Sequence, residues 1–172
     1  ASIETTAPAA TPAGVTRIDV AGRPVLPGLI DAHAHIATPD AARRALESGV
    51  TTARVLGDVF LQALGTRDLI RAGHVAGPEL IVSSSIIRPK PGMAFYQAYP
   101  EFGRFVSAEL RGPDTIAAVV KAQIARGVDV IKVGASERAG LASTDPRRAE
   151  LTEDEMRAAV QAARAAGRHV AA

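Results

Sequence analysis

Two histidines, His33 and His35, lie two residues apart in the mostly apolar stretch 28–35. In a β-strand, residues i and i+2 point to the same side, so the two imidazoles should project together. Imidazole is the commonest metal-ligating side chain at neutral pH, and the pair therefore predicts a metal site. The alternative is a pair of hydrogen-bonded core histidines. Asp31 shares this side one pleat deeper, where it either orients a ligand or is satisfied by the backbone as the strand begins.

Lys132 is the second residue whose surroundings suggest chemistry. Only three of the 20 basic residues are lysines, and this one is flanked by the apolar β-branched residues Ile131 and Val133. Burying an ammonium there is costly unless it is paired or neutralised. One solution is reaction with carbon dioxide, because a carbamylated lysine carries a carboxylate that can bridge two metal ions. The alternatives are a lysine paired with a neighbouring acid, or one whose tip reaches a wet strand end.

Other residues could contact a substrate. Arg54, at the end of an apolar strand, could meet a substrate carboxylate, and a structural ion pair explains it equally well. Tyr96 and Tyr99 belong to a loop that contains five of the six aromatic residues of the chain. These five are Phe95, Tyr96, Tyr99, Phe102 and Phe105. They predict an apolar lid over the substrate, and the alternative is a loop that needs its own small core.

The elements that must position these residues alternate in type from Leu29 onward. The pattern predicts strands at 29–36, 50–56, 80–84, 128–133 and 168–172. Helices are expected between Pro39 and Gly49, 58 and 72, Pro113 and Gly127, and Thr152 and Gly167. Apolar strands that follow glycine-terminated helices are typical of a parallel α/β fold, either doubly wound or a (β/α)8 barrel. No Gly-rich phosphate loop follows the first strand, which disfavours a nucleotide-binding sheet.

Residues 29–172 are therefore predicted to form strands 1–4, helices 1–4 and the start of strand 5. A full (β/α)8 TIM barrel takes about 250 residues, so these elements correspond to its N-terminal half. Residues 1–28 are rich in proline and contain short β-prone pieces around Ile3 and Val15–Val20. They predict short strands and turns without a helix.

The histidine pair on the first strand and the lysine on the fourth occur in the order of the binuclear metal-dependent amidohydrolase superfamily. Residues 25–35 resemble the opening signature of that superfamily. Residues 49–54 and 127–132 are similar to the branch that contains imidazolonepropionase-like enzymes and Xaa-Pro or Xaa-Arg dipeptidases. The chain departs from this branch after Arg54 and at 85–90, where Ser-Ile-Ile-Arg-Pro-Lys replaces a frequent Gly-Gly-His stretch. Both departures bear on the substrate.

The resemblance implies a (β/α)8 barrel with a small β-sandwich to which residues 1–28 contribute. It implies two divalent metal ions, usually zinc, that activate a bridging hydroxide and polarise the scissile carbonyl. His33 and His35 would hold one metal, and carbamylated Lys132 would bridge both. Two histidines of the fifth and sixth strands and an aspartate of the eighth are expected beyond Ala172. The 172 residues alone are therefore expected to be inactive.

Composition narrows the partners. The net charge of +2 and the scattered basic residues argue against a nucleic-acid partner, and no apolar run approaches the roughly 20 residues that span a membrane. We expect hydrolysis of an amide (C–N) bond in a dipeptide, N-acyl amino acid or related small amide. A phosphoester or lactone hydrolase on the same barrel and an inactive fragment or binding protein are the alternatives. We also expect a homo-oligomer for the full-length protein, and localisation stays open, with the cytoplasm slightly favoured.

Overall fold

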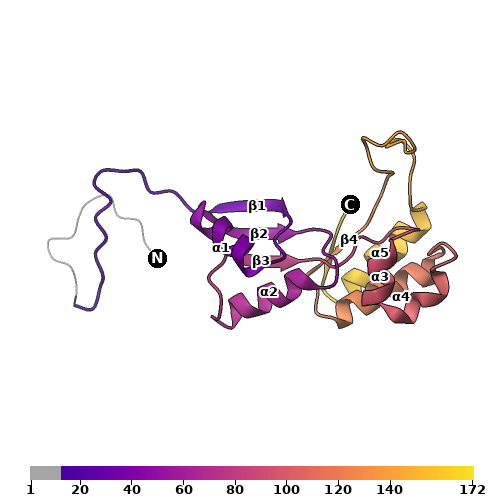
Figure 1. Ribbon diagram of the computed structural model, residues 1–172, viewed down its shortest axis with the longest axis horizontal. Helices are drawn as coiled ribbons and strands as arrows, with labels where there is room; N and C mark the ends of the chain where they lie inside the picture. Colours follow the sequence, from indigo (N-terminus) through magenta and orange to yellow (C-terminus); the bar gives the residue numbers. More distant parts are fainter. Residues whose placement is uncertain (1–12) are drawn as a thin grey trace.

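The computed structural model describes residues 13–172, in which strands and helices alternate along the chain (Figure 1). The strands are β1 (Leu29–Ala34), β2 (Val50–Val55), β3 (Glu79–Val82), β4 (Val130–Lys132) and β5 (His169–Ala171). The helices are α1 (Pro39–Glu47), α2 (Gln62–Arg71), α3 (Met93–Ala98), the 3-10 helix η1 (Pro100–Phe105), α4 (Pro113–Ala125) and α5 (Glu153–Ala165). This order confirms the predicted α/β class.

The helices begin and end where capping chemistry places them. The Thr38 side chain accepts a hydrogen bond from the Ala41 amide at the start of α1. Glycines follow the helices at left-handed positions, as at Gly49 and Gly127, whose φ angles are 95° and 88°. Glycine adopts this conformation without the Cβ penalty, so the chain turns sharply into the next strand. No helix within residues 13–172 is long and apolar enough to cross a bilayer.

All the strand pairs are parallel. One sheet has the order β1-β2-β3 and a second pairs β4 with β5. The segment after β3 joins the two sheets, because the Asp129 amide donates to the Val82 carbonyl and Ile87 forms a parallel bridge with Val133. The strands thus follow one another in chain order, as the barrel prediction requires. They form no closed barrel within residues 13–172, where β1 and β5 remain edge strands.

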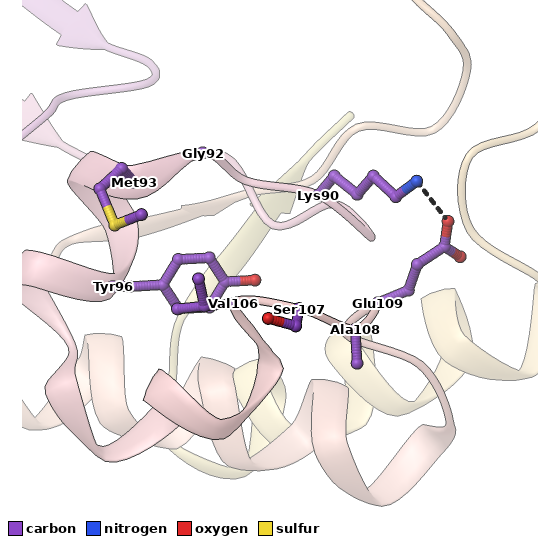
Figure 2. A pocket seen from close by; sticks show the side chains of 8 residues that line it. All are labelled: Lys90, Gly92, Met93, Tyr96, Val106, Ser107, Ala108 and Glu109. Carbon is purple, nitrogen blue, oxygen red and sulfur yellow. Dashed lines mark ion pairs between the residues drawn. The ribbon is translucent and has the colours of Figure 1, made fainter.

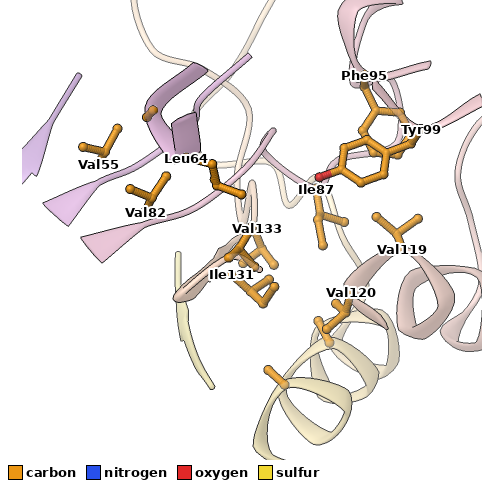
Figure 3. Packing of buried hydrophobic residues seen from close by; sticks show 14 of the residues in the cluster. Val55, Leu64, Val82, Ile87, Phe95, Tyr99, Val119, Val120, Ile131 and Val133 are labelled. Atoms are coloured by element: carbon orange, nitrogen blue, oxygen red, sulfur yellow. The ribbon is translucent and has the colours of Figure 1, made fainter. Parts of the chain in front are cut away.

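One face of the strands packs against the helices. Figure 3 shows Val55 and Val82 of the first sheet near Leu64 of α2. It shows Ile131 of β4 and Val133, which follows β4, on the side of α4. Most of these side chains are fully buried. Because side chains alternate along a strand, the residues between them point to the opposite face. That opposite face contains the candidate site.

The segment between β3 and α4, expected as one long loop, contains α3 and η1. Both are short, six residues each. Such short helices lack a periodic apolar face that could be recognised in the sequence, and they form here because their aromatic side chains pack on one another. Figure 1 shows α3, α4 and α5 gathered beside β4, whereas α1 and α2 lie beside β1–β3.

The second helix begins later than predicted. The predicted helix started at residue 58, but residues 57–61 form a turn in which Phe60 and Leu61 have φ angles of 56° and 59°. The buried Asp58 carboxylate accepts a hydrogen bond from the Ala63 amide and holds the turn. Non-glycine residues seldom adopt such left-handed angles, so no propensity rule anticipates this turn.

Residues 13–28 contain two turns and no strand. The predicted strand around Val15–Val20 is therefore not formed, and the predicted strand around Ile3 lies outside the described residues. The assignment of residues 1–28 to a β-sandwich stays a prediction.

Candidate functional site

The two histidines lie together at the C-terminal end of β1. Their ring centroids are 5.5 Å apart, with an angle of 56° between the ring planes, and both residues are exposed. Ala34 and Ile36, on the other side of the chain, pack into the core. The imidazoles therefore point away from the helices, side by side on the open face. The Asp31 carboxylate accepts a hydrogen bond of 2.9 Å from the His33 amide, which matches the alternative of a carboxylate satisfied by the backbone.

Lys132 ends β4 on the same face of the fold. Its neighbours Ile131 and Val133 are buried in the core, whereas Lys132 itself is half-buried on the opposite side of the strand. Burial lowers the pKa of the Lys132 ammonium, and the positive charges of Arg54 and Arg88 lower this pKa further. The neutral amine is the form that reacts with carbon dioxide, so these surroundings favour the form that carbamylation needs.

Arg54 of β2 is bound to the strand that bears the histidines, and its charge acts on Lys132. Its Nε donates a hydrogen bond of 2.9 Å to the Ala32 carbonyl. Among residues 13–172 it makes no ion pair with a carboxylate, so the structural ion pair expected as an alternative is not formed there. The guanidinium therefore keeps donors for another partner on the open face.

The donors on this face fit part of a metal centre. Two adjacent imidazoles suit zinc and related divalent ions, and a carbamylated lysine would add two oxygens. Within residues 13–172, no cluster brings together three or more histidine, cysteine, aspartate or glutamate side chains that could hold a metal ion. The described residues therefore supply two imidazoles and one lysine.

A turn at the end of β2 comes near His35. Gly57 has a φ of 92°, and a Cβ added there would lie 3.2 Å from the Ile86 side chain and 4.0 Å from the His35 ring. The next residue, Asp58, is buried, and this burial raises the pKa of its carboxyl although backbone amides bond to it. Neither Gly57 nor Asp58 was predicted to belong to the site from the sequence. A glycine followed by an aspartate directly after a strand was the available signal.

The aromatic loop has its own core. Tyr99 and Phe95 are fully buried, with ring centroids 5.0 Å apart, and the Tyr99 hydroxyl donates to the buried Ser84 hydroxyl. The Tyr96 hydroxyl donates to the Phe105 carbonyl at 3.0 Å. These contacts favour the packing alternative over the predicted lid. The assignment of both tyrosines to substrate binding remains a prediction, and the contacts of Tyr99 do not support it.

One cavity lies beside this loop, and neither histidine lines it. It has a volume of about 450 Å³ and is lined by α3 and residues 106–109. Figure 2 shows Tyr96 and Met93 on one side and the Lys90–Glu109 ion pair, at 3.4 Å, on the other. None of the predicted metal ligands lines it, so this cavity is separate from the predicted metal site.

Comparison with known proteins decides the family. Residues 25–172 match the amidohydrolase family. The chain belongs to the amidohydrolase family. This match confirms the resemblance that the histidine signature indicated. A search of curated protein sequences finds no significant match.

Solved structures agree with the family assignment. An amidohydrolase structure aligns with a TM-score of 0.70 and 27% identity over 93% of this chain and 46% of that one. A Xaa-Pro dipeptidase with bound methionine in its active site aligns with a TM-score of 0.66 and 26% identity, over 84% of this chain and 42% of the dipeptidase. A prolidase complexed with N-methylphosphonate-L-proline aligns with a TM-score of 0.64 and 26% identity, over 89% of this chain and 44% of the prolidase. The chain thus spans less than half the length of these structures.

Proposed function

We propose that this amidohydrolase cleaves an amide (C–N) bond in a dipeptide, an N-acyl amino acid or a related small amide. The observation that carries the proposal is the pair of imidazoles at the end of β1, on the same face as a half-buried lysine at the end of β4. In a parallel α/β fold the C-terminal ends of the strands are where active sites form. Family members of similar fold, among them a Xaa-Pro dipeptidase, support this chemistry.

His33 and His35 would hold one divalent ion, zinc by the chemistry of the donors, and Lys132 would bridge it to a second. When bound, such ions supply Lewis acidity toward an amide carbonyl and lower the pKa of water. The remaining ligands and a general base are expected from the later strands of the barrel that we propose for the full-length protein.

The lysine must first become an anion. The neutral Lys132 amine attacks carbon dioxide, a nitrogen–carbon bond forms, one carbon–oxygen π pair moves onto oxygen, and a proton leaves the nitrogen to solvent. The product is a carbamate whose two oxygens would be available as metal ligands. Arg54, whose Nε is bound to the Ala32 carbonyl, holds its positive charge near this anion. Arg54 would thereby stabilise the carbamate or orient a substrate.

The test uses the full-length protein that carries this sequence, loaded with zinc. Metal content and hydrolysis of N-acyl amino acids, dipeptides, a lactone and a phosphoester are measured for the wild type and for His33→Asn, His35→Asn and His74→Asn. His74 follows α2, and its substitution serves as the matched control. We expect the first two variants to lose metal and amide hydrolysis together and His74→Asn to retain both. Preferential turnover of the lactone or phosphoester, or full activity of His35→Asn, would contradict the proposal.

A further inference from the structure

The loop after β3 brings an arginine to the end of β4. The Ile87 amide donates to the Lys132 carbonyl, and the Gly134 amide donates to the Ile87 carbonyl, each at 2.9 Å. Arg88 follows directly, so its side chain starts beside the C-terminal end of the strand that bears the lysine. Arg88 thus lies on the active-site side of the fold.

The guanidinium of Arg88 has N–H donors that are free to bind a ligand. Its nearest carboxylate is Glu150, with 3.6 Å between Nε and Oε2, which is beyond a good hydrogen bond. Within residues 13–172 Arg88 donates no hydrogen bond, and its buried Nε and the buried Glu150 Oε2 both lack a partner. A five-donor group that is partly buried and unsatisfied favours a ligand that brings acceptor oxygens.

Gly134 makes room for this arrangement. A Cβ added there would collide with the Glu150 carboxylate and would lie 3.5 Å from the Arg88 Nε and Nη2. The backbone of Glu150 is also held in place, because its amide donates to the Ala135 carbonyl and its carbonyl accepts from Arg111. Glu150 therefore orients the Arg88 side chain without satisfying it.

Arg88 also lines a cavity whose wall includes the turn at Gly57. This cavity has a volume of about 230 Å³, and its walls include Gly57, Ile86, Phe95, Arg88 and Lys90. A Cβ added at Gly57 would lie 3.2 Å from the Ile86 side chain and 4.0 Å from the His35 ring, so this wall of the cavity lies near His35. The cavity therefore combines apolar walls with two cationic side chains beside a predicted metal ligand.

Among residues 13–172, Asp58 supplies the only carboxylate that lines this cavity. It is buried and engaged by the Ala63 amide. Lys90 is largely exposed and pairs with Glu109. Arg88 is thus the cation best placed to meet a ligand inside the cavity.

We propose that Arg88 binds the carboxylate of the substrate in this cavity, so that the enzyme selects anionic amides over neutral ones. This inference rests on the proposed function and narrows its substrate class to amides of amino acids with a free carboxylate. The planar guanidinium can meet a carboxylate with two parallel hydrogen bonds, which a lysine cannot do. The apolar walls, formed by Ile86 and Phe95, suit an aliphatic side chain next to that carboxylate.

The test compares two probes that differ only in charge, N-acetyl-L-leucine and N-acetyl-L-leucinamide, with acetate release as the readout. It uses the zinc-loaded full-length protein and the variants Arg88→Met, Arg88→Lys and Arg164→Met. Arg164 lies exposed on α5, makes no ion pair among the described residues, and serves as the matched control. We expect Arg88→Met to lower kcat/KM for the acid about 10- to 100-fold, mainly through KM, and to change the amide by less than about 2-fold. The kcat/KM of Arg88→Lys for the acid should lie between those of the wild type and Arg88→Met, and Arg164→Met should match the wild type.

An equal loss on both probes would assign Arg88 to holding Glu150 and would overturn the inference, as would no loss on either. Calorimetric binding of N-acetyl-L-leucine separates this inference from the proposed function. If the wild type binds the acid, Arg88→Met does not, and no amide is cleaved, the carboxylate site stands and the proposed hydrolysis fails. If amides are cleaved but Arg88→Met and Arg88→Lys bind the acid as tightly as the wild type, the inference alone fails.

Discussion

The Glu155 carboxylate connects the N-terminus of α5 to the N-terminus of α4, and its removal should be costly. It accepts hydrogen bonds of 2.8 Å from the Thr152 amide and 2.8 Å from the Gly112 amide. Its side chain is only 3% exposed, and Arg111 lies 3.3 Å away. Hydrogen bonds to a charged group contribute about 1.5–3 kcal/mol each, so Glu155→Ala should lower the free energy of unfolding by roughly 3–6 kcal/mol.

Glu155→Gln keeps the shape and one acceptor oxygen, and should cost about half as much. Glu153→Gln is the matched control, because Glu153 is exposed in the same first turn and pairs only with Arg157. An exposed pair of this spacing contributes about 0.3–0.5 kcal/mol. Urea unfolding of the full-length protein, followed by circular dichroism, measures all three variants. A cost for Glu155→Ala no larger than that for Glu153→Gln would refute the reasoning.

The pH dependence of the stability of Glu155→Gln tests how much the charge of Glu155 contributes to the fold. Burial by itself raises the pKa of Glu155, but the Thr152 and Gly112 amides and Arg111 outweigh it, so the pKa is lowered overall. A carboxyl whose folded pKa is depressed stabilises the fold above its unfolded pKa of about 4.3, and this contribution is lost as the pH falls through the folded value. The stability gap between wild type and Glu155→Gln should therefore be constant above about pH 5 and shrink below it. A gap that widens on acidification would contradict this sign.

Three further predictions concern two residues near the site and the behaviour of the 172-residue chain by itself. Gly57→Ala places a Cβ at a left-handed position 3.2 Å from Ile86, so it should destabilise the fold by about 1–3 kcal/mol and lower activity, as thermal melts and amide turnover would show. Tyr99→Phe removes the hydrogen bond to Ser84 and should lower the free energy of unfolding by about 1–3 kcal/mol with KM unchanged. A raised KM would instead indicate that Tyr99 binds substrate. Among residues 13–172, one edge of β1 and one edge of β5 lack a partner strand, and Ile30 is 76% exposed. Light scattering of the 172-residue chain by itself should therefore show aggregates, and assays should show no hydrolysis; a soluble, active monomer would refute both.

Much of the fold could be predicted because its signals are local. Apolar strands, helix caps and glycines at helix ends lie within a few residues of the elements that they define, as Thr152 and Glu155 do in the capping box of α5. The placement of His33 and His35 followed from the two-residue period of a strand. The burial of Ile131 and Val133 followed in the same way, leaving Lys132 to the other face.

The remainder depends on contacts between distant residues. Arg88 reaches the end of β4 because Ile87 bridges to Val133, a pairing across 46 positions that no local pattern encodes. The packing of Tyr99 beside Ser84 joins residues 15 positions apart, so the sequence left open both a lid and a small core for the aromatic loop. The turn at Phe60 and Leu61 uses left-handed angles that only the surrounding structure can enforce.

The central claim, a carbamylated lysine that bridges two metal ions, is tested most directly by Lys132→Arg in the full-length protein. Arginine keeps the positive charge and can pair with carboxylates, but it cannot form the carbamate. Metal content per chain and amide hydrolysis are measured together on Lys132→Arg and on Lys132→Ala, with Lys121→Arg on α4 as the control. We predict that both Lys132 variants lose metal and activity together, and that small carboxylic acids partly restore Lys132→Ala. Lys132→Arg with two metal ions per chain and near wild-type turnover would contradict the bridging role.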